Sequence, residues 1–422
     1  MQPNNSQGPA KKPYHSYSHS SKPGGPRRFH GARFSGPRKP HFGGNRGRGG
    51  KKNMGQYIDP ARFINKAPVV ETAPVEYKPK HAFADFAIDA RLKTNISHKK
   101  YVLPTPIQDQ SIPHILAGSD IVGIANTGTG KTAAFLIPLI NKVLHAPQEK
   151  ILIMVPTREL AQQIEAEFKG FAFGLSMYAV SVVGGASITN QMRQLSRRPQ
   201  FIIGTPGRLK DLLDRKAIDL AQYSTVVLDE ADRMLDMGFI NDVKMMLAKM
   251  SPNRHTLFFS ATMSREIEAL IHQFLKNPVR VSVKTGDTAN TIEQDVIRVP
   301  AGKDKFALLC ELLAQPGFDK VLIFGRTKHG VQRLAHQISH AGFKAESIHG
   351  NKSQPQRQKA LSLFKEHHLK VLVATDVAAR GLDIAGVSHV INYDVPATYE
   401  DYVHRIGRTG RGGKKGKALT FV

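Results

Sequence analysis

A short loop rich in glycine and threonine, at residues 125–132, joins an apolar run to a helical one. Gly128 and Gly130 would let backbone N–H groups approach phosphate oxygens, and the helix that follows would add its N-terminal dipole. Lys131 would reach the outer phosphates, and Thr132 would ligate Mg²⁺. Because an apolar strand precedes the loop and a helix follows it, this pattern predicts a nucleotide phosphate site rather than a chance turn.

Acidic residues end another apolar run further along the chain, in Thr225-Val-Val-Leu-Asp-Glu-Ala-Asp232. In a parallel sheet, such residues lie at the carboxyl end of a strand, where ligands bind. Asp229 is expected to hold Mg²⁺, and Glu230 is expected to orient and deprotonate an attacking water. A carboxylate pair is weak support by itself, but together with the phosphate loop it predicts ATP hydrolysis.

These loops need strands and helices to position them, and the chain alternates between short β-branched runs and helical stretches from about residue 80. This alternation predicts an α/β fold with parallel sheets flanked by crossover helices. A break rich in turn-forming residues, at 284–290, divides the pattern into two tandem domains. We predict strands at 120–125, 150–155, 178–183, 201–204, 225–228 and 256–260 before the break, and at 294–299, 320–324, 345–348, 371–374, 389–392 and 418–422 after it.

The bulk composition points to a polyanionic partner. The 422 residues carry a formal net charge of +26, which favours nucleic acid first and an anionic membrane surface second. No window approaches the roughly 18 apolar residues of a membrane span, and no secretory signal is present, so we expect a soluble cytoplasmic protein without membrane contact. A single cysteine, Cys310, excludes a disulfide framework and is expected to be buried in a helix. We predict no metal site made of His or Cys.

The N-terminal segment, residues 1–56, contains twelve Lys or Arg and no Asp or Glu, with many Gly, Pro and Ser. Such a segment cannot bury enough apolar surface to offset its ordering entropy, so we predict a disordered basic tail, followed by a linker at 57–82. Five aromatic residues alternate with its arginines, which suits sequence-tolerant RNA binding by charge and base stacking. The alternative is a tail that only increases solubility.

The sequence Asp229-Glu-Ala-Asp232 resembles the motif that names the DEAD-box ATP-dependent RNA helicases of superfamily 2, and the chain is similar to their bacterial type. The accompanying motifs occur in the family's order across most of residues 83–422. The resemblance implies two RecA-like domains, at 83–283 and 291–422, joined by a linker at 284–290. It also implies ATP and Mg²⁺ as cofactors and RNA as the partner.

In this family, an upstream aromatic residue and a glutamine select adenine, which match Phe83 and Gln108. Without that context, the two residues would be a core phenylalanine and a helix-capping glutamine. Lys100 stands where the family usually has glycine, which leaves the local turn open. The positions that match the family's ATP-binding residues are Phe83, Gln108, Ala125, Asn126, Thr127, Gly128, Thr129, Gly130, Lys131, Thr132, Gly381 and Asp383.

Two further motifs resemble those that connect hydrolysis to domain closure. Ser260 and Thr262, together with His404, match coupling positions, although Ser260-Ala-Thr262 alone could be a surface turn. Arg408 and Arg411 match arginine fingers that would neutralise charge on the phosphates, although a basic helix exposed to solvent is the alternative. The expected catalytic set is Lys131, Asp229, Glu230, Arg408 and Arg411.

The resemblance also implies RNA contacts, many of them at helix starts after strands, where free N–H groups can bind the sugar-phosphate backbone. These positions are Pro156, Thr157, Arg158, Gly185, Thr205, Arg208, Gln354, Arg357 and Thr375. Binding of this kind carries little sequence information. Ribonucleoprotein and ribosome-assembly complexes stay open as further partners. The rival hypotheses are an RNA-annealing scaffold with a decayed ATPase and a DNA helicase with a related core.

Deleting residues 1–56 should weaken RNA binding and flatten its dependence on salt, because twelve basic residues and their counterion release are removed. Fluorescence anisotropy with a labelled single-stranded RNA over a series of salt concentrations measures both effects. If the deleted and full chains bind equally at every salt concentration, the tail does not bind RNA.

Overall fold

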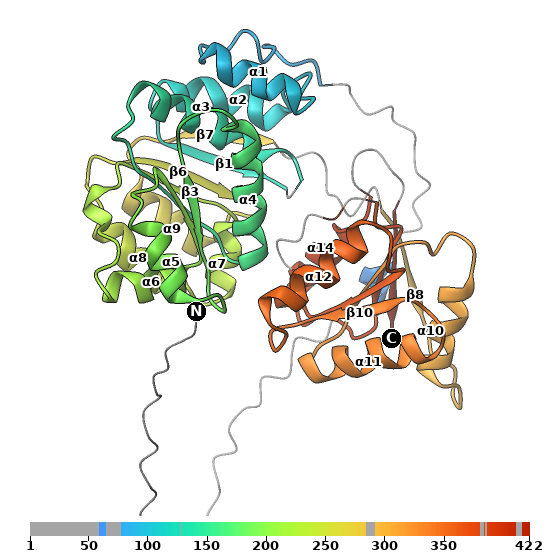
Figure 1. Ribbon diagram of the computed structural model, residues 1–422. Coiled ribbons are helices and arrows are strands. Elements are labelled where there is room, and N and C mark those ends of the chain that lie inside the picture. The colour runs from blue at the N-terminus through green and yellow to red at the C-terminus, as the bar shows by residue number, and fades with distance from the viewer. Residues whose placement is uncertain are drawn as a thin grey trace, which may run out of the picture. The chain divides into compact units, whose positions relative to one another are not determined.

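The computed structural model describes residues 59–64, 77–126, 128–283, 292–379, 384, 386–410 and 416–422. The predicted disordered tail at 1–56 and the predicted linker at 284–290 lie outside these residues. Within them, the chain forms two parallel sheets, each flanked by helices (Figure 1). The predicted α/β fold with two tandem parallel-sheet domains is therefore confirmed.

The first sheet has seven strands among the described residues, in the order β3-β4-β2-β5-β6-β1-β7. All neighbouring strands are parallel. The strands are β1 (Ile121–Ala125), β2 (Ile151–Met154), β3 (Ala179–Val182), β4 (Phe201–Gly204), β5 (Thr225–Leu228), β6 (His255–Ser260) and β7 (Val279–Val283). Most are short and fully buried, because helices cover both faces of a parallel sheet.

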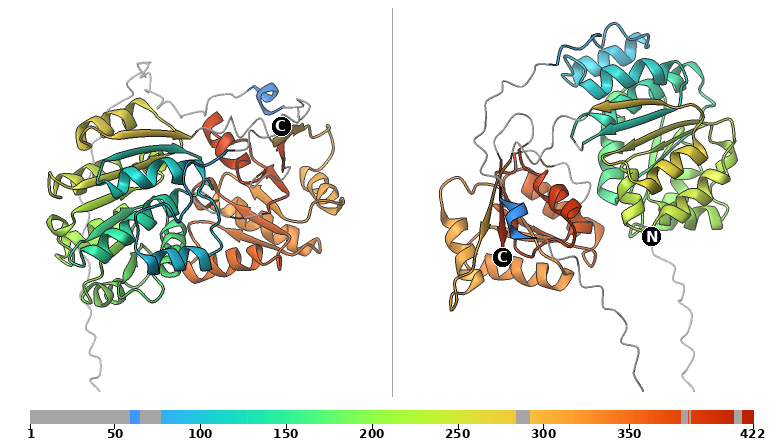
Figure 2. Two further views of the ribbon diagram at one scale, coloured as in Figure 1. Left: turned by 90° about the horizontal axis from the view of Figure 1, so that it is seen from above. Right: turned by 180° about the vertical axis from the view of Figure 1, so that it is seen from behind.

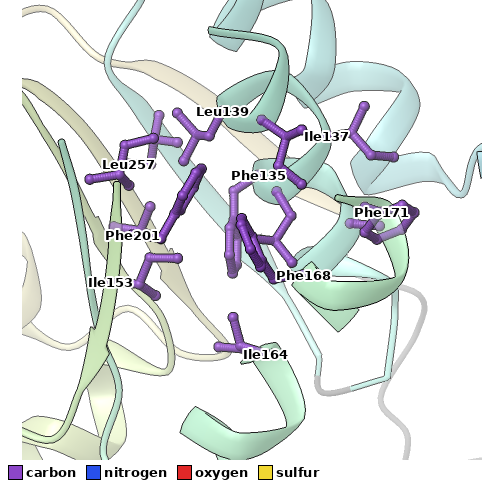
Figure 3. Close-up of a cluster of buried hydrophobic side chains, with 14 of the residues drawn as sticks. Phe135, Ile137, Leu139, Ile153, Ile164, Phe168, Phe171, Phe201 and Leu257 are labelled. Carbon is purple, nitrogen blue, oxygen red and sulfur yellow. The ribbon is translucent and has the colours of Figure 1, made fainter. Parts of the chain in front are cut away.

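Helices α1 to α4 cover one face of this sheet and α5 to α9 cover the other. Successive strand residues alternate between the two cores: Ile153 faces the first, and Leu152 and Met154 face the second. Figure 3 shows part of the first core, where Phe135, Phe168 and other apolar side chains meet. The helices are α1 (Ala90–His98), α2 (Pro106–Leu116), α3 (Lys131–His145), α4 (Arg158–Phe171), α5 (Ile188–Leu195), α6 (Pro206–Asp214), α7 (Ala231–Asp236), α8 (Ile240–Ala248) and α9 (Arg265–Phe274), with the 3₁₀ turn η2 (Leu220–Gln222).

The second sheet has six parallel strands among the described residues, in the order β10-β11-β9-β12-β13-β8. Helices α10 and α11 pack on one face, and α12, α13 and α14 on the other (Figure 1). The strands are β8 (Ile292–Ile297), β9 (Val321–Phe324), β10 (Ala345–Ile348), β11 (Val371–Ala374), β12 (His389–Asn392) and β13 (Gly416–Phe421). The helices are α10 (Lys305–Ala314), α11 (Lys328–His340), α12 (Gln354–Lys365), α13 (Asp376–Ala379) and α14 (Tyr399–Ile406), and a 3₁₀ turn, η1 (Pro60–Phe63), precedes them all in the chain.

The predicted strands coincide with observed ones to within two residues, but β7 was not predicted. This edge strand has only Val281 buried, and its sequence Val279-Arg-Val-Ser-Val283 is not a continuous apolar run; the alternation of apolar and polar residues was the signal that was missed. The prediction that Cys310 is buried was wrong, because α10 turns Leu309 and Leu313 into the core and leaves Cys310 partly exposed. Among the helices in the described ranges, none combines the length and hydrophobicity needed to cross a membrane.

Lys100 ends the first helix in the left-handed conformation, with φ of 59°. Its N–H donates to the Ser97 carbonyl at 2.8 Å, and the Tyr101 N–H donates to the Ile96 carbonyl at 3.3 Å. This pair of bonds is a Schellman motif, in which glycine is usual because it has no Cβ to clash. The Tyr101 ring then packs edge-on against Phe171 at a centroid distance of 5.4 Å. The turn therefore forms in spite of the lysine.

Replacing Lys100 with glycine should raise the free energy of unfolding by about 0.5–1 kcal/mol, because the left-handed strain disappears. Lys93→Gly, inside α1, is the matched control and should lower it by about 1 kcal/mol. Urea titration followed by circular dichroism measures both. A loss of stability in Lys100→Gly would show that the side chain itself stabilises the turn.

Candidate nucleotide and RNA site

The phosphate loop follows β1 and leads directly into α3. Gly128 and Gly130 have φ of 86° and 93°, and Gly130 is the residue that caps α3. A side chain at Gly130 would collide with the Gln108 amide, so both backbone conformation and space require glycine there. Lys131 is 6% exposed, and its Nζ donates to the Ala125 carbonyl at 2.9 Å. The loop thus holds a buried ammonium group beside a helix start.

The acidic motif follows β5, and its first peptide N–H, on Asp229, donates to the Met154 carbonyl of β2 at 3.0 Å. Glu230 then adopts the left-handed conformation, with φ of 53° and ψ of 49°, where α7 begins. Its N–H donates to the Asp229 carboxylate at 2.9 Å. A non-glycine residue in this conformation costs about 1–3 kcal/mol and is typical of functional sites. The strained turn places two buried carboxylates at the end of the strand.

Arg233 forms a buried ion pair with Glu230, at 2.7 Å between Nη1 and Oε2. The two side chains are 3% and 4% exposed. Sequence reasoning missed Arg233, although the i, i+3 spacing on a helix that starts at the acidic motif was a signal for it. The guanidinium fixes the carboxylate that is expected to act on water.

Asp232 connects the acidic motif to the residues after β6. Its Oδ2 accepts hydrogen bonds from the Ala261 N–H, the Thr262 N–H and the Thr262 hydroxyl, at 3.0, 2.9 and 3.1 Å. Ser260 closes the same turn by donating to the Thr262 carbonyl at 2.7 Å. Burial tends to raise the pKa of Asp232, but the nearby Lys131 and Arg233 cations outweigh it and lower that pKa. The structure thus brings Ser260 and Thr262, two of the three predicted coupling residues, against the acidic motif as a charged, hydrogen-bonded unit.

The strand order explains why these motifs meet. Strands β5, β6 and β1 are neighbours in the sheet, and all three run in the same direction. The acidic motif, the Ser260 turn and the phosphate loop follow these strands, so all three lie at one edge. Residues more than a hundred positions apart in the sequence therefore form one site.

Gln108 and Phe83 have the structural roles that the sequence offered as alternatives, a helix-capping glutamine and a core phenylalanine. The Gln108 side chain is 1% exposed, accepts from the Thr105 N–H at 2.9 Å and donates to the Gly130 carbonyl at 3.0 Å. Phe83 is 6% exposed and packs edge-on against Phe86 and Tyr101. Gln108 caps α2 and supports the phosphate loop, and Phe83 belongs to the core. Their role in selecting adenine stays a prediction.

The remaining half of the first sheet's edge carries the predicted RNA residues, after β2, β3 and β4. Thr157 and Thr205 are the N-cap residues of α4 and α6. Arg158 lies against Gly185, where any side chain would collide with its guanidinium. Arg208 donates from Nη1 to the Ala186 carbonyl at 3.1 Å. Two helix starts and two arginines thus converge on one surface.

The second sheet carries its own set of predicted residues. Thr375 follows β11, and His404 lies on α14 with Arg408 just beyond its end. Gln354 and Arg357 lie in the first turn of α12. Thr127, Gly381, Asp383 and Arg411 lie outside the described residues.

Sequence reasoning also missed Arg405, which is 2% exposed. Its guanidinium forms a bidentate pair with Asp376, at 2.5 and 2.8 Å, and donates to the Asn392 side chain at 3.2 Å. This pair joins α14, next to the predicted arginine finger, to α13, next to Thr375. The sequence signal for Arg405 was its place in the arginine-rich motif at 404–411, of which only Arg408 and Arg411 were predicted to be functional arginines.

Comparison with known proteins agrees with this geometry. Residues 105–270 match the DEAD/DEAH box helicase family, and residues 304–413 match the helicase conserved C-terminal domain. The chain is 44% identical over 342 residues to the ATP-dependent RNA helicase CshA of Listeria monocytogenes, covering 81% of this chain and 66% of that protein. It is 45% identical over 341 residues to the RNA helicase CrhR of Synechocystis, covering 81% and 69%.

A solved structure of S. cerevisiae Dbp5 bound to RNA and ADP BeF3 is similar, with a TM-score of 0.71 and 30% identity, covering 81% of this chain and 89% of that one. The family matches cover β1 to β6 of the first sheet and β9 to β12 of the second, and the motif residues stand at the strand ends described above. This chain therefore belongs to the DEAD-box family of ATP-dependent RNA helicases.

Proposed function

We propose that this chain hydrolyses ATP in an RNA-stimulated manner and uses the cycle to close and open two domains around RNA. Closing would unwind short duplexes locally or remodel RNA–protein complexes. The observation that carries the proposal is the unit formed by Asp232, Thr262 and the turn at Ser260, next to the buried Lys131. This unit links the nucleotide site to a neighbouring strand end by direct hydrogen bonds, as energy coupling requires.

The donor set fits Mg²⁺. Asp229 is 2% exposed and, because of burial, its pKa is raised to about 6; Lys131 opposes this shift and Glu230 adds to it. A buried carboxylate next to a second one is costly when ionised, and a divalent cation would remove that cost. The described residues contain no cluster of three or more His, Cys, Asp or Glu side chains that could hold a metal. Mg²⁺ commonly binds in this way, through one or two protein oxygens and substrate phosphates. Asp229 and the Thr132 hydroxyl would hold it, and it would neutralise phosphate charge.

The chain's own residues divide the remaining work. Lys131 would bind the outer phosphates after exchanging its bond to the Ala125 carbonyl for a phosphate oxygen. Glu230 would orient the attacking water and accept its proton, with Arg233 holding its carboxylate. Arg408 and Arg411 would supply positive charge from the second domain, so that hydrolysis would require domain closure.

Gln108 can cap its helix and still recognise adenine. A carboxamide has two N–H donors and an oxygen with two lone pairs, and the described bonds to Gly130 and Thr105 use one donor and one lone pair. One donor and one acceptor site remain, which is what the adenine edge needs. Phe83 would contribute by supporting this segment or by stacking on the base.

RNA would run along the half of the first sheet's edge that carries Thr157, Arg158, Thr205 and Arg208. These groups offer helix N-termini and guanidinium charge, which bind backbone phosphate with little regard to sequence. We place the two domains at 83–283 and 291–422, joined by 284–290, and the protein in the cytoplasm. Ribonucleoprotein or ribosome assemblies are the partners that such an activity would meet.

Asp229→Asn should stabilise the metal-free protein by roughly 1–3 kcal/mol at pH 7.5 and by about half as much at pH 5. Folding raises this pKa to about 6, so at higher pH the folded protein must ionise a buried carboxyl, which costs stability. The cost decreases as the pH falls towards the ordinary pKa of Asp, because the carboxyl then becomes protonated in the folded state. Asn keeps the oxygen that accepts from the Glu230 N–H. Urea unfolding in EDTA measures the difference, with the exposed Asp214→Asn as control. An equal gain at both pH values would contradict the raised pKa.

The function itself is tested by steady-state ATPase activity with and without single-stranded RNA. We expect RNA-stimulated turnover in the full chain, a loss of at least about a hundredfold in Glu230→Gln, and little change in Glu266→Gln, an exposed control on the same domain. A matched single-stranded DNA should stimulate much less. Equal stimulation by DNA would favour a DNA helicase, and no turnover under any condition would favour an RNA-binding scaffold.

A further inference from the structure

A short segment ahead of the first domain, Asp59–Ile64, packs against the second domain. It contains η1, which begins at Pro60, and the Asp59 carboxylate caps it by accepting from the Ala61 N–H at 2.9 Å. Phe63 is completely buried, whereas Asp59, Ala61 and Ile64 are exposed. The chain therefore touches the second domain before it builds the first.

The Phe63 ring lies in an apolar socket formed by two strands and a helix. Ile292 of β8, Ala418 of β13, and Tyr402 and Ile406 of α14 make the socket. The rings of Phe63 and Tyr402 have centroids 4.6 Å apart and planes tilted by 49°. In Figure 2, the blue turn lies beside the orange and red strands of the second sheet in the view from behind.

The socket has a defined shape because its tyrosine is fixed. The Tyr402 hydroxyl is buried and donates to the Gln294 side chain of β8 at 2.8 Å. A four-residue 3₁₀ turn has no stability of its own in water, since so few hydrogen bonds do not offset the ordering entropy. Burial of one large aromatic side chain is the interaction that can hold it. Phe63 is thus the anchoring residue of the segment.

We propose that Asp59–Ile64 is an intramolecular anchor that binds the basic tail to the second domain and, through residues 65–76, forms a second tether between the two domains. The residue that fills the socket is Phe63 of the same chain. The twelve residues 65–76 can span at most about 45 Å at roughly 3.3–3.6 Å per residue. The anchor therefore gives the two domains a second covalent connection, longer than the linker at 284–290.

The anchor also supports the helix that carries the predicted coupling histidine. Tyr402 and Ile406 are four residues apart on one face of α14, whereas His404 points from the opposite face. Packing Phe63 on the first face helps to set the position of α14, beyond whose end Arg408 lies. This consequence for catalysis rests on the proposed function, but the anchor itself does not.

The test uses the full chain with one protease recognition sequence introduced within residues 65–76. After cleavage, nuclease treatment and size-exclusion chromatography at 0.5 M salt, the N-terminal fragment should elute with the body of the protein. High salt removes contacts made by the basic tail but not an apolar anchor. Phe63→Ala should release the fragment, since loss of a buried ring weakens binding by about a hundredfold or more. Phe63→Leu should retain most of it.

Ile64→Ala, which changes an exposed neighbour, is the matched control and should retain the fragment. Release of the fragment from the unmutated chain, or equal retention in Phe63→Ala, would overturn the anchor. Uncut protein that forms dimers through Phe63, seen by light scattering, would mean that the segment docks on a second copy and would overturn the intramolecular tether. None of these readouts uses ATPase activity, so a failure of the proposed function would be seen separately.

Discussion

The parallel direction of the strands in the first sheet is the constraint on which the rest of this site depends. It places every strand's carboxyl end, and the start of every following helix, at one edge. Strand order then divides this edge into a half that follows β5, β6 and β1 and a half that follows β3, β4 and β2. The first half holds the groups suited to phosphate chemistry, and the second holds helix starts and arginines suited to a nucleic-acid backbone. One sheet therefore presents two adjacent sets of residues suited to different ligands, without a separate scaffold for each.

The nucleotide half of the edge is built at a cost to stability. Glu230 is held in a left-handed conformation, and Asp229 and Lys131 are buried with little water around them. Hydrogen bonds and ion pairs offset part of that cost: Asp232 accepts three hydrogen bonds, and Glu230 is paired with Arg233. Strained backbone and buried charge are tolerated here because the surrounding parallel sheet, buried on both faces, holds the loops in place.

In the second domain, too, side-chain contacts between distant segments hold an element that carries predicted site residues, here helix α14. Arg405 joins α14 to α13 through a bidentate pair with Asp376, while Phe63 packs on α14 from outside the domain's own sequence. A partly buried ion pair and one buried ring thus help to set the position of this helix. A segment that precedes the first domain in the chain therefore packs on the second.

The sequence by itself determined the chemistry and the type of fold. Glycines, lysine and carboxylates at strand ends specify a phosphate site because few other residue types can approach or hold phosphate, and the alternation of apolar runs predicted twelve strands that the structure contains. Tertiary structure decided the contacts between distant residues. The partners of Arg405 and Phe63 and the partial exposure of Cys310 depend on which strands pair and which helix face turns inward. No local pattern encodes those choices, because the free energy that selects them comes from packing between segments far apart in the chain.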